Sequence, residues 1–308
     1  MLASENIQKK NSMGMKRRRQ NIFLFFFLLF PMLQFLVFYV GVNFNSFVLA
    51  FQRYDGTDYV FNGFNSFGDV IKDIFVTGDL MIAVRNSAIQ FLCALAIIPV
   101  NIITAYGIFK KIYFSGFFKI MLFMPNMISS LVFVICARYL IQNGFPIIFN
   151  DPNLRLLNVL EDSSFYSVLI FGLWMQFASG LVIYLGAMGS ISQEVMEYGK
   201  IENLSTLKEL WFVVVPLIFP TITTYLVVAL AGFFTNQGFF YSFYGGAVIG
   251  NTPYDTLGYV FFVKVVGDNV TLADYPYAAA GGLLFTAFVA PITIIVKTLL
   301  EKYGPSED

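Results

Sequence analysis

Six long stretches of this 308-residue chain contain no Asp, Glu, Lys or Arg. They are residues 22–51, 86–109, 120–137, 163–193, 210–254 and 275–296. A bilayer has a hydrocarbon core about 30 Å thick, which a helix of about 20 apolar residues crosses. Hydrophobic residues make up 57% of the chain and charged residues only 12%, unlike soluble domains. The sequence therefore predicts an all-α integral membrane protein with six transmembrane helices.

The fifth uncharged stretch is too long for a single crossing. A spanning helix fits residues 213–235, which leaves a Gly- and Tyr-rich remainder, NQGFFYSFYGGAVIGNTPYD. We expect this remainder to be non-helical and to fold back at the outer mouth, because irregular backbone at membrane depth needs protein or water around it.

Basic and acidic residues fall on opposite sides of the predicted bundle. Most of the 19 Lys and Arg residues lie in the loops of one side, and the other side is acidic. Because loops rich in Lys and Arg stay in the cytoplasm, both termini are predicted to be cytoplasmic. The basic cluster at residues 16–19 is interpreted as an anchor for this topology, not as a nucleic-acid patch. Residues 22–51 exceed the apolar core of a signal peptide and should remain as the first helix.

The residue inventory excludes many enzyme classes. The chain has no His, and its cysteines, Cys93 and Cys136, lie within apolar stretches. A zinc cluster, a His-based triad or a disulfide framework is therefore not expected, and we predict no metal site. The glycines at positions 245 and 250 are followed by Asn251 and not by the Lys-Ser/Thr of a phosphate-binding loop. If a nucleotide drives this protein, another subunit binds it.

The loop at residues 189–211 carries too many charges to cross the membrane, yet its pattern is helical. Ser192 is a suitable N-cap, and apolar residues recur with the spacing of one helix face. Asn203 then stands where the chain must turn, and Asn accepts a left-handed conformation well. The apolar residues are Val195, Tyr198, Ile201 and Leu204. This pattern predicts a short helix that ends in a tight turn.

A second helix is predicted to start directly after that turn. Thr206 and Glu209 have the spacing of a capping box. Pro216 and Pro220 follow within the apolar run and should bend the fifth helix near its cytoplasmic end. The result is a cytoplasmic helix-turn-helix that exposes an apolar strip and several charges, a surface suited to docking a partner.

This loop resembles the EAA loop of the inner-membrane permeases of ATP-binding-cassette (ABC) importers. Glu197-Tyr198-Gly199 stands at the family's Glu-Ala-Ala, Glu202-Asn203 at its Asp-Gly, and Val215-Pro216 at its hydrophobic-Pro. The Tyr-Gly and Asn departures imply an altered fit to the ATPase. The resemblance implies that the coupling residues are Glu194, Glu197, Tyr198, Gly199, Ile201, Glu202, Asn203 and Leu204.

Further segments resemble the carbohydrate-uptake branch of this family, the maltose and oligosaccharide permeases. They include the FNGFNSF stretch at 61–67, Trp174 with the LGAM stretch at 185–188, and the YAAAG stretch at 277–281. The resemblance implies a type I ABC importer permease of the bacterial cytoplasmic membrane. Its implied partners are a second permease chain, two ATPase subunits that bind ATP and Mg, and an extracytoplasmic binding protein that meets loops 52–80, 141–162 and 245–274. We expect a basic segment at residues 1–20, one membrane domain at 21–300 and a cytoplasmic tail at 301–308.

A transport cavity for sugar would offer aromatic faces and neutral hydrogen-bonding groups. The fourth and fifth helices supply such candidates, and neither span has a charged residue in its middle, which favours a neutral substrate. The candidates are Trp174, Gln176, Tyr184, Tyr225, Asn236, Gln237, Tyr241 and Tyr244. Most aromatic residues in so apolar a chain pack against other side chains or face lipid. The alternative for each aromatic candidate is therefore a packing or lipid-facing role.

Other function classes remain open at this point. An ion-coupled secondary transporter would need a coupling carboxylate within its helices, and the predicted crossings contain none. A membrane-embedded enzyme lacks its usual His or acid pairs here. An ABC permease for a non-sugar solute is a further alternative, since the resemblance implies that the binding protein selects the substrate.

Overall fold

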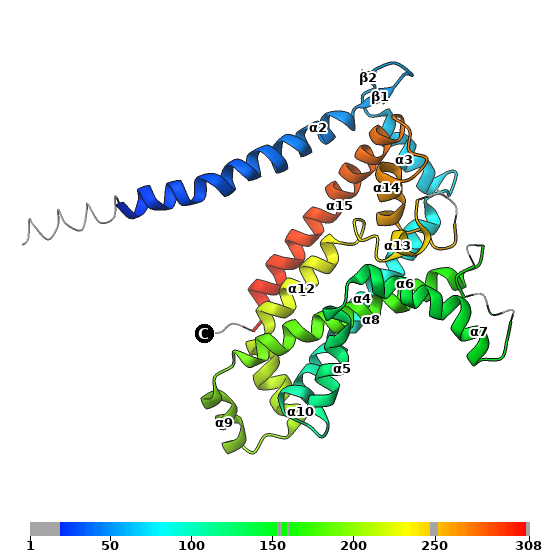
Figure 1. Cartoon of the computed structure of the whole chain (residues 1–308). Coiled ribbons are helices and arrows are strands. Elements are labelled where there is room, and N and C mark those ends of the chain that lie inside the picture. The colour runs from blue at the N-terminus through cyan, green and yellow to red at the C-terminus, as the bar shows by residue number, and fades with distance from the viewer. Residues whose placement is uncertain (1–18, 153, 155, 159, 247–251, 306–308) are drawn as a thin grey trace, which may run out of the picture.

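The protein is described by a computed structural model at residues 19–152, 154, 156–158, 160–246 and 252–305. Helices dominate it, and a β-hairpin of β1 and β2 is the sheet that the described residues form (Figure 1). In that hairpin, Arg53 pairs with Val60 in antiparallel register. The elements are η1 (Phe35–Gly41), α2 (Val42–Leu49), β1 (Gln52–Tyr54), β2 (Tyr59–Phe61), α3 (Asn65–Phe75), α4 (Met81–Phe109), α5 (Ser115–Met127), α6 (Ser130–Tyr139), η2 (Leu140–Gly144), α7 (Phe145–Ile148), α8 (Ser163–Gly189), α9 (Gln193–Ile201), α10 (Thr206–Glu209), η3 (Leu210–Val214), α11 (Val215–Leu217), α12 (Phe219–Ala231), α13 (Phe240–Tyr244), α14 (Leu257–Val266) and α15 (Asp274–Tyr303).

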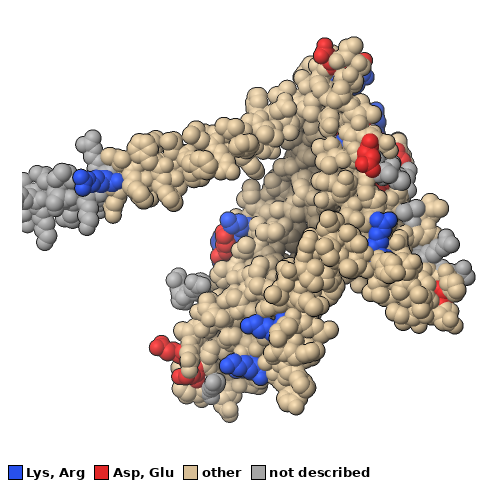
Figure 2. Space-filling view, viewed as in Figure 1, with Lys and Arg blue, Asp and Glu red and all other residues tan. Residues whose placement is uncertain are grey.

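Five helices in the described part are long and apolar enough to cross a membrane, and a bent pair can supply a sixth crossing. This agrees with the predicted all-α membrane fold. In Figure 2, most of this face is uncharged, and the charged side chains form small, separate groups. The predicted basic segment at residues 1–20 lies outside the described residues except for its last two positions.

The first helix runs from Arg19 to Leu49 and meets the bundle where α2 contacts α15, from which it points away, as Figure 1 shows in blue. No residue of η1 or α2 is buried. Its aromatic and aliphatic side chains therefore face the surroundings of the chain along most of their length.

The centre of the bundle is formed by α4 and α8, which pack along each other, while α12 packs against α15 and also contacts α4. Tyr106 of α4, Tyr184 and Met188 of α8, and Leu210 of η3 belong to one apolar cluster. This cluster also includes Met196 of α9, so the helix-turn-helix joins the main core. The hairpin and the helix-turn-helix lie at opposite ends of the bundle (Figure 1).

The third uncharged stretch is not one helix, so the prediction of a crossing at residues 120–137 is wrong. Helix α5 ends at Met127 and α6 begins at Ser130, because Ile128 and Ser129 have extended ψ angles of 144° and 128°. Asn and Ser side chains compete with the helical backbone for hydrogen bonds, and Asn126, Ser129 and Ser130 all stand at this break. The apolar helix of spanning length is Ser130–Ile148.

The fifth stretch bends as predicted, although its bounds differ. The crossing predicted at residues 213–235 consists of Thr206–Leu217 followed by Phe219–Ala231, and the 71° angle between them confirms the predicted bend at Pro216 and Pro220. Pro216 and Pro220 lie on either side of this bend, and both occupy early positions of their helices, where a missing N–H costs little. Within the remainder that was predicted to be non-helical, α13 is a short helix; residues 247–251 lie outside the described part.

Candidate functional site

The helix-turn-helix consists of α9, a turn at Asn203, and α10. The hydroxyl oxygen of Ser192 accepts from the N–H of Val195 at 3.4 Å, as expected for an N-cap. Asn203 has a φ of 51°, which confirms the predicted left-handed turn. The N–H of Leu204 reaches back to the carbonyl of Gly199 at 3.2 Å, and this bond closes the end of α9.

The predicted capping box at the start of α10 is wrong. Ser205, not Thr206, is the N-cap residue, and no side chain caps the helix. The carboxylate of Glu209 instead accepts hydrogen bonds from Nζ of Lys110 at the end of α4, at 2.8 and 2.9 Å. The buried setting favours this charged partner over a backbone N–H, because a buried charge needs a counter-charge.

The outer face of α9 carries an apolar strip that the rest of the described chain does not cover. Val195, Tyr198 and Ile201 are exposed by 38%, 65% and 80%. Glu194, Glu197, Glu202 and Asn203 are exposed around the strip, whereas Gly199 is buried and Leu204 is half-buried. Gln193 donates to the carboxylate of Glu197 at 2.9 Å, so this carboxylate is held along the helix. Together these residues form a charged, apolar-centred surface at one end of the molecule.

A cavity of about 230 Å³ opens between α4, α8 and α12. No Asp, Glu, Lys or Arg contributes to its lining. The polar lining consists of Ser87, Gln90, Asn101, Gln176, Tyr225 and Asn236. Such a neutral wall can donate and accept hydrogen bonds without fixing a charge.

A second cavity of about 380 Å³ shares three amide side chains with the first. Gln90, Gln176 and Asn236 line both, so they form one amide cluster from three parts of the chain. Gly238 makes this approach possible: it has a φ of +57°, and a Cβ there would lie 2.9 Å from Nε2 of Gln90. Its N–H donates to Oδ1 of Asn236 at 2.8 Å.

The predicted substrate-pathway residues divide into two groups. Gln176, Tyr225 and Asn236 line the cavities, and Tyr184 lies beside Tyr225, with ring centres 5.3 Å apart. The hydroxyl of Tyr184 and Oε1 of Gln237 are buried without a hydrogen-bond partner among the described residues.

Trp174, Tyr241 and Tyr244 do not line these two cavities. Trp174 packs on Phe133, and Tyr241 packs on Phe262. Tyr244 stacks on Tyr254 and donates from its hydroxyl to the carbonyl of Ser164 at 3.0 Å. Within this chain, these three side chains therefore pack against neighbouring aromatic rings, and their place in a substrate pathway stays a prediction.

Sequence reasoning missed the contribution of α4 to the cavity. Ser87, Gln90 and Asn101 recur at the spacing of one helix face inside an apolar stretch. Polar side chains inside a membrane helix signal a functional or packing role, and this signal was present in the second stretch as well as in the fourth.

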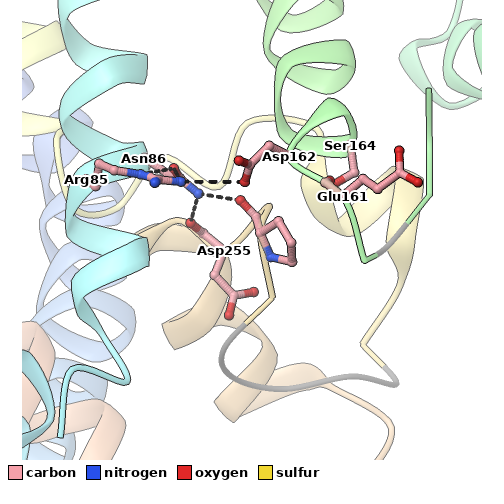
Figure 3. A network of polar contacts seen from close by, with 7 residues as sticks. Arg85, Asn86, Glu161, Asp162, Ser164 and Asp255 are labelled. Carbon is pink, nitrogen blue, oxygen red and sulfur yellow. Dashed lines mark hydrogen bonds and ion pairs between the residues drawn. The ribbon is translucent and has the colours of Figure 1, made fainter. Parts of the chain in front are cut away.

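Near the hairpin end, a polar network fixes the segment before α14 onto α4 (Figure 3). Asn86 is fully buried, and its Nδ2 donates to the carbonyls of Pro253 and Asp255, both at 2.8 Å. The N–H of Leu257 donates to the hydroxyl of Ser87 at 2.9 Å. Arg85 hydrogen-bonds Asn86 and lies 3.8 Å from the carboxylate of Asp162 at the start of α8. The network holds the cavity walls together at this end.

Burial governs the carboxyl group of Asp255 in the same segment. Removal from water raises its pKa above the ordinary 3.8, although hydrogen bonds from Thr252 oppose the shift. The main-chain N–H of Thr252 donates to this carboxyl group at 3.0 Å, and its hydroxyl donates as well.

Two known proteins that are similar to this chain are permease proteins of sugar transport systems. The multiple sugar-binding transport system permease protein MsmF of Streptococcus mutans is 22% identical over 90% of this chain and 94% of its own length. The arabinooligosaccharides transport system permease protein AraP of Bacillus subtilis is 22% identical over 88% of this chain and 86% of its own length.

The fold is also that of a solved transporter. A chain of a bacterial ABC transporter involved in the import of the acidic polysaccharide alginate superposes with a TM-score of 0.69 at 18% identity, covering 94% of this chain and 98% of that chain. The family described as binding-protein-dependent transport system inner membrane component matches residues 97–305. This protein therefore belongs to that family, as a multi-pass component of the cytoplasmic membrane.

Proposed function

We propose that this chain is the permease subunit of an ATP-driven importer for a neutral sugar or oligosaccharide. The uncharged, amide-lined cavity carries this proposal. Gln90, Gln176 and Asn236 can donate to and accept from sugar hydroxyls, and Tyr225 adds an aromatic face. The lining of these cavities contains no Lys or Arg that could pair with the negative charge of an acidic sugar. The proposed substrate therefore differs from the acidic polysaccharide alginate, which the similar solved transporter imports.

The proposed assembly contains a second permease, two ABC ATPases that bind ATP and Mg, and an extracytoplasmic binding protein. The exposed strip of Val195, Tyr198 and Ile201 supports an ATPase contact, because an apolar centre with a charged rim is typical of protein interfaces. This chain would itself be non-catalytic, because the family that it matches consists of membrane components of transport systems.

In the proposed cycle, ATP binding and the loaded binding protein both favour the outward-open state. Each must interact better with that state than with the inward-open one, since a ligand that binds both states equally shifts nothing. Glu197 and its neighbours would contact the ATPase and transmit its conformational change. The cavity between α4, α8 and α12 would then open to the outside.

Uptake by the reconstituted complex tests this proposal. Vesicles that hold the chain with its partner permease, ATPase and binding protein should accumulate a neutral labelled oligosaccharide only with ATP. Gln176→Ala and Asn236→Ala should each raise the KM for uptake, whereas Tyr241→Phe should leave it unchanged, because Tyr241 does not line the cavity.

The alternatives predict other results. Uptake that needs an ion gradient and no ATP would indicate a secondary transporter. ATP-dependent uptake of a non-sugar solute, with neutral sugars excluded, would retain the importer and replace the substrate class.

A further inference from the structure

We infer that Lys110 and Glu209 fasten the helix-turn-helix to α4, so that the helix-turn-helix and the α4 wall of the cavity move as one rigid body. The inference rests on the proposed function, since the moving force would come from an ATPase subunit. Nζ of Lys110 contacts both carboxylate oxygens of Glu209, at 2.8 and 2.9 Å. The Glu209 side chain is only 5% exposed and that of Lys110 25%, so water screens this pair far less than a surface pair.

A second contact lies one turn earlier on the same face of α4. The hydroxyl of Tyr106 donates to the main-chain carbonyl of Thr206 at 3.1 Å. Tyr106 and Lys110 are four residues apart on α4, while Thr206 and Glu209 are three apart on α10, so the two contacts run side by side. Two contact points fix the direction of α10 as well as its position.

Helix α9 belongs to the same unit. Gly199 is buried against Glu209, where a Cβ on the glycine would lie 3.8 Å from Cγ of the glutamate. Met196 of α9 packs in the apolar cluster that contains Tyr106 and Leu210. The side chain of Glu209 thus lies beside Gly199 of α9 and bonds Lys110 at the end of α4.

In this proposal α4 transmits a displacement of α9 to the cavity, because the helix is continuous over 29 residues, through Pro99. Gln90 and Asn101 of this helix line the cavity. A displacement of α9 would therefore move these amides without any intervening loop. Helix α10 is connected to α12, the other wall of the cavity, through η3 and α11, and the 71° bend separates α11 from α12.

The test compares the wild-type complex with the apolar double variant Lys110→Met/Glu209→Leu. Replacing both charges avoids an unpaired buried charge, which a single substitution would leave. The matched control is Lys297→Met/Glu301→Leu on α15, an exposed pair with a separation of 3.6 Å. Readouts are co-purification with the ATPase, sugar taken up per ATP hydrolysed, and the distance between spin labels at Gln193 and Val100 in a Cys-free background.

In the wild type and the control, we expect one narrow label distance with and without ATP. In the apolar variant, the ATPase should still bind and hydrolyse ATP, while the label distances broaden and uptake per ATP falls by about 5- to 150-fold, the range of typical coupling between sites. The charge-reversed pair Lys110→Glu/Glu209→Lys should recover part of the loss. If the apolar variant does not assemble, Lys110→Gln/Glu209→Gln, which also removes both charges and keeps two polar side chains, replaces it.

Two results would overturn the inference. One is wild-type uptake per ATP in the variant, and the other is a label distance that already changes with ATP in the wild type. Both results differ from the result expected if the proposed function is wrong, because in that case the wild-type chain itself would bind no ATPase.

Discussion

The side-chain amide of Asn86 donates a 2.8 Å hydrogen bond to the main-chain carbonyl of Asp255, which joins the start of α4 to the segment before α14. The same amide also reaches Pro253. One buried side chain thus satisfies two carbonyl groups of a non-helical segment, as backbone near the apolar region of a membrane protein requires.

Asn86→Leu should destabilise the protein, because it leaves these carbonyls without their donor. An unsatisfied buried polar group costs about 1–3 kcal/mol. Thermal unfolding in detergent would show a clear decrease in Tm. Asn143→Leu is the matched control: Asn143 is exposed and its amide donates to the carbonyl of Tyr139 in the preceding turn, so the Tm of this variant should stay near that of the wild type. Equal Tm values for the two variants would contradict a stabilising role of Asn86.

Gly238→Ala should impair uptake beyond its effect on stability. The new Cβ would lie 2.9 Å from Nε2 of Gln90 and would displace an amide of the cavity wall. The positive φ adds about 1–2 kcal/mol of strain for a non-glycine residue.

Gly63→Ala separates these two effects. Gly63 has a similar φ of +61°, and no atom lies within 4 Å of its added Cβ. Both variants should lose stability to a similar degree, and only Gly238→Ala should raise the KM for uptake. A similar KM in both variants would show that the Gln90 position is unimportant.

Tyr198→Ala and Ile201→Ser should weaken ATPase binding and leave the Tm unchanged, since both side chains are largely exposed in the chain alone. Central interface residues cost more than about 1–2 kcal/mol when truncated, which corresponds to about a tenfold or greater loss of affinity. Pull-down of the ATPase at graded concentrations measures this loss. Leu160→Ser, at an 83% exposed position before α8, should bind normally; a similar loss there would indicate a non-specific effect.

Asp255 should make stability depend on pH. Because burial raises its pKa above 3.8 in the folded state, the folded protein holds this proton more tightly than the unfolded chain. The resulting stabilisation is complete below pH 3.8 and is lost as the pH rises through the folded-state pKa. The Tm of the wild type minus that of Asp255→Asn should therefore decrease from about pH 4 to pH 8. A constant difference would show that Asp255 does not titrate differently on folding.

The sequence allowed the local features of the helix-turn-helix to be predicted, because they depend on neighbouring residues. Ser192 and Asn203 act within a few positions of themselves, and their capping and turn preferences are intrinsic. The pairing of Glu209 with Lys110 could not be predicted in this way, because the two residues are 99 positions apart and meet only when α4 packs beside α10.

The break between α5 and α6 shows another limit. Uncharged composition identifies a segment that tolerates lipid, but it does not distinguish a straight helix from two helices that meet at Ile128 and Ser129. The cavity amides are an intermediate case. Gln176 stood out in its apolar stretch, and Gln90 carried the same signal, yet their proximity depends on the packing of α4 against α8.

The separate first helix has a consequence for the evolution of this chain. Since η1 and α2 bury no residue and α2 meets the bundle at α15, exchange of one apolar residue for another in η1 leaves the packing of α4, α8 and α12 untouched. Substitutions that preserve hydropathy can therefore accumulate in this part of the helix without affecting the folding of the bundle. Its sequence is free to follow the lipid or protein that surrounds it, while the amide-lined cavity admits far fewer changes.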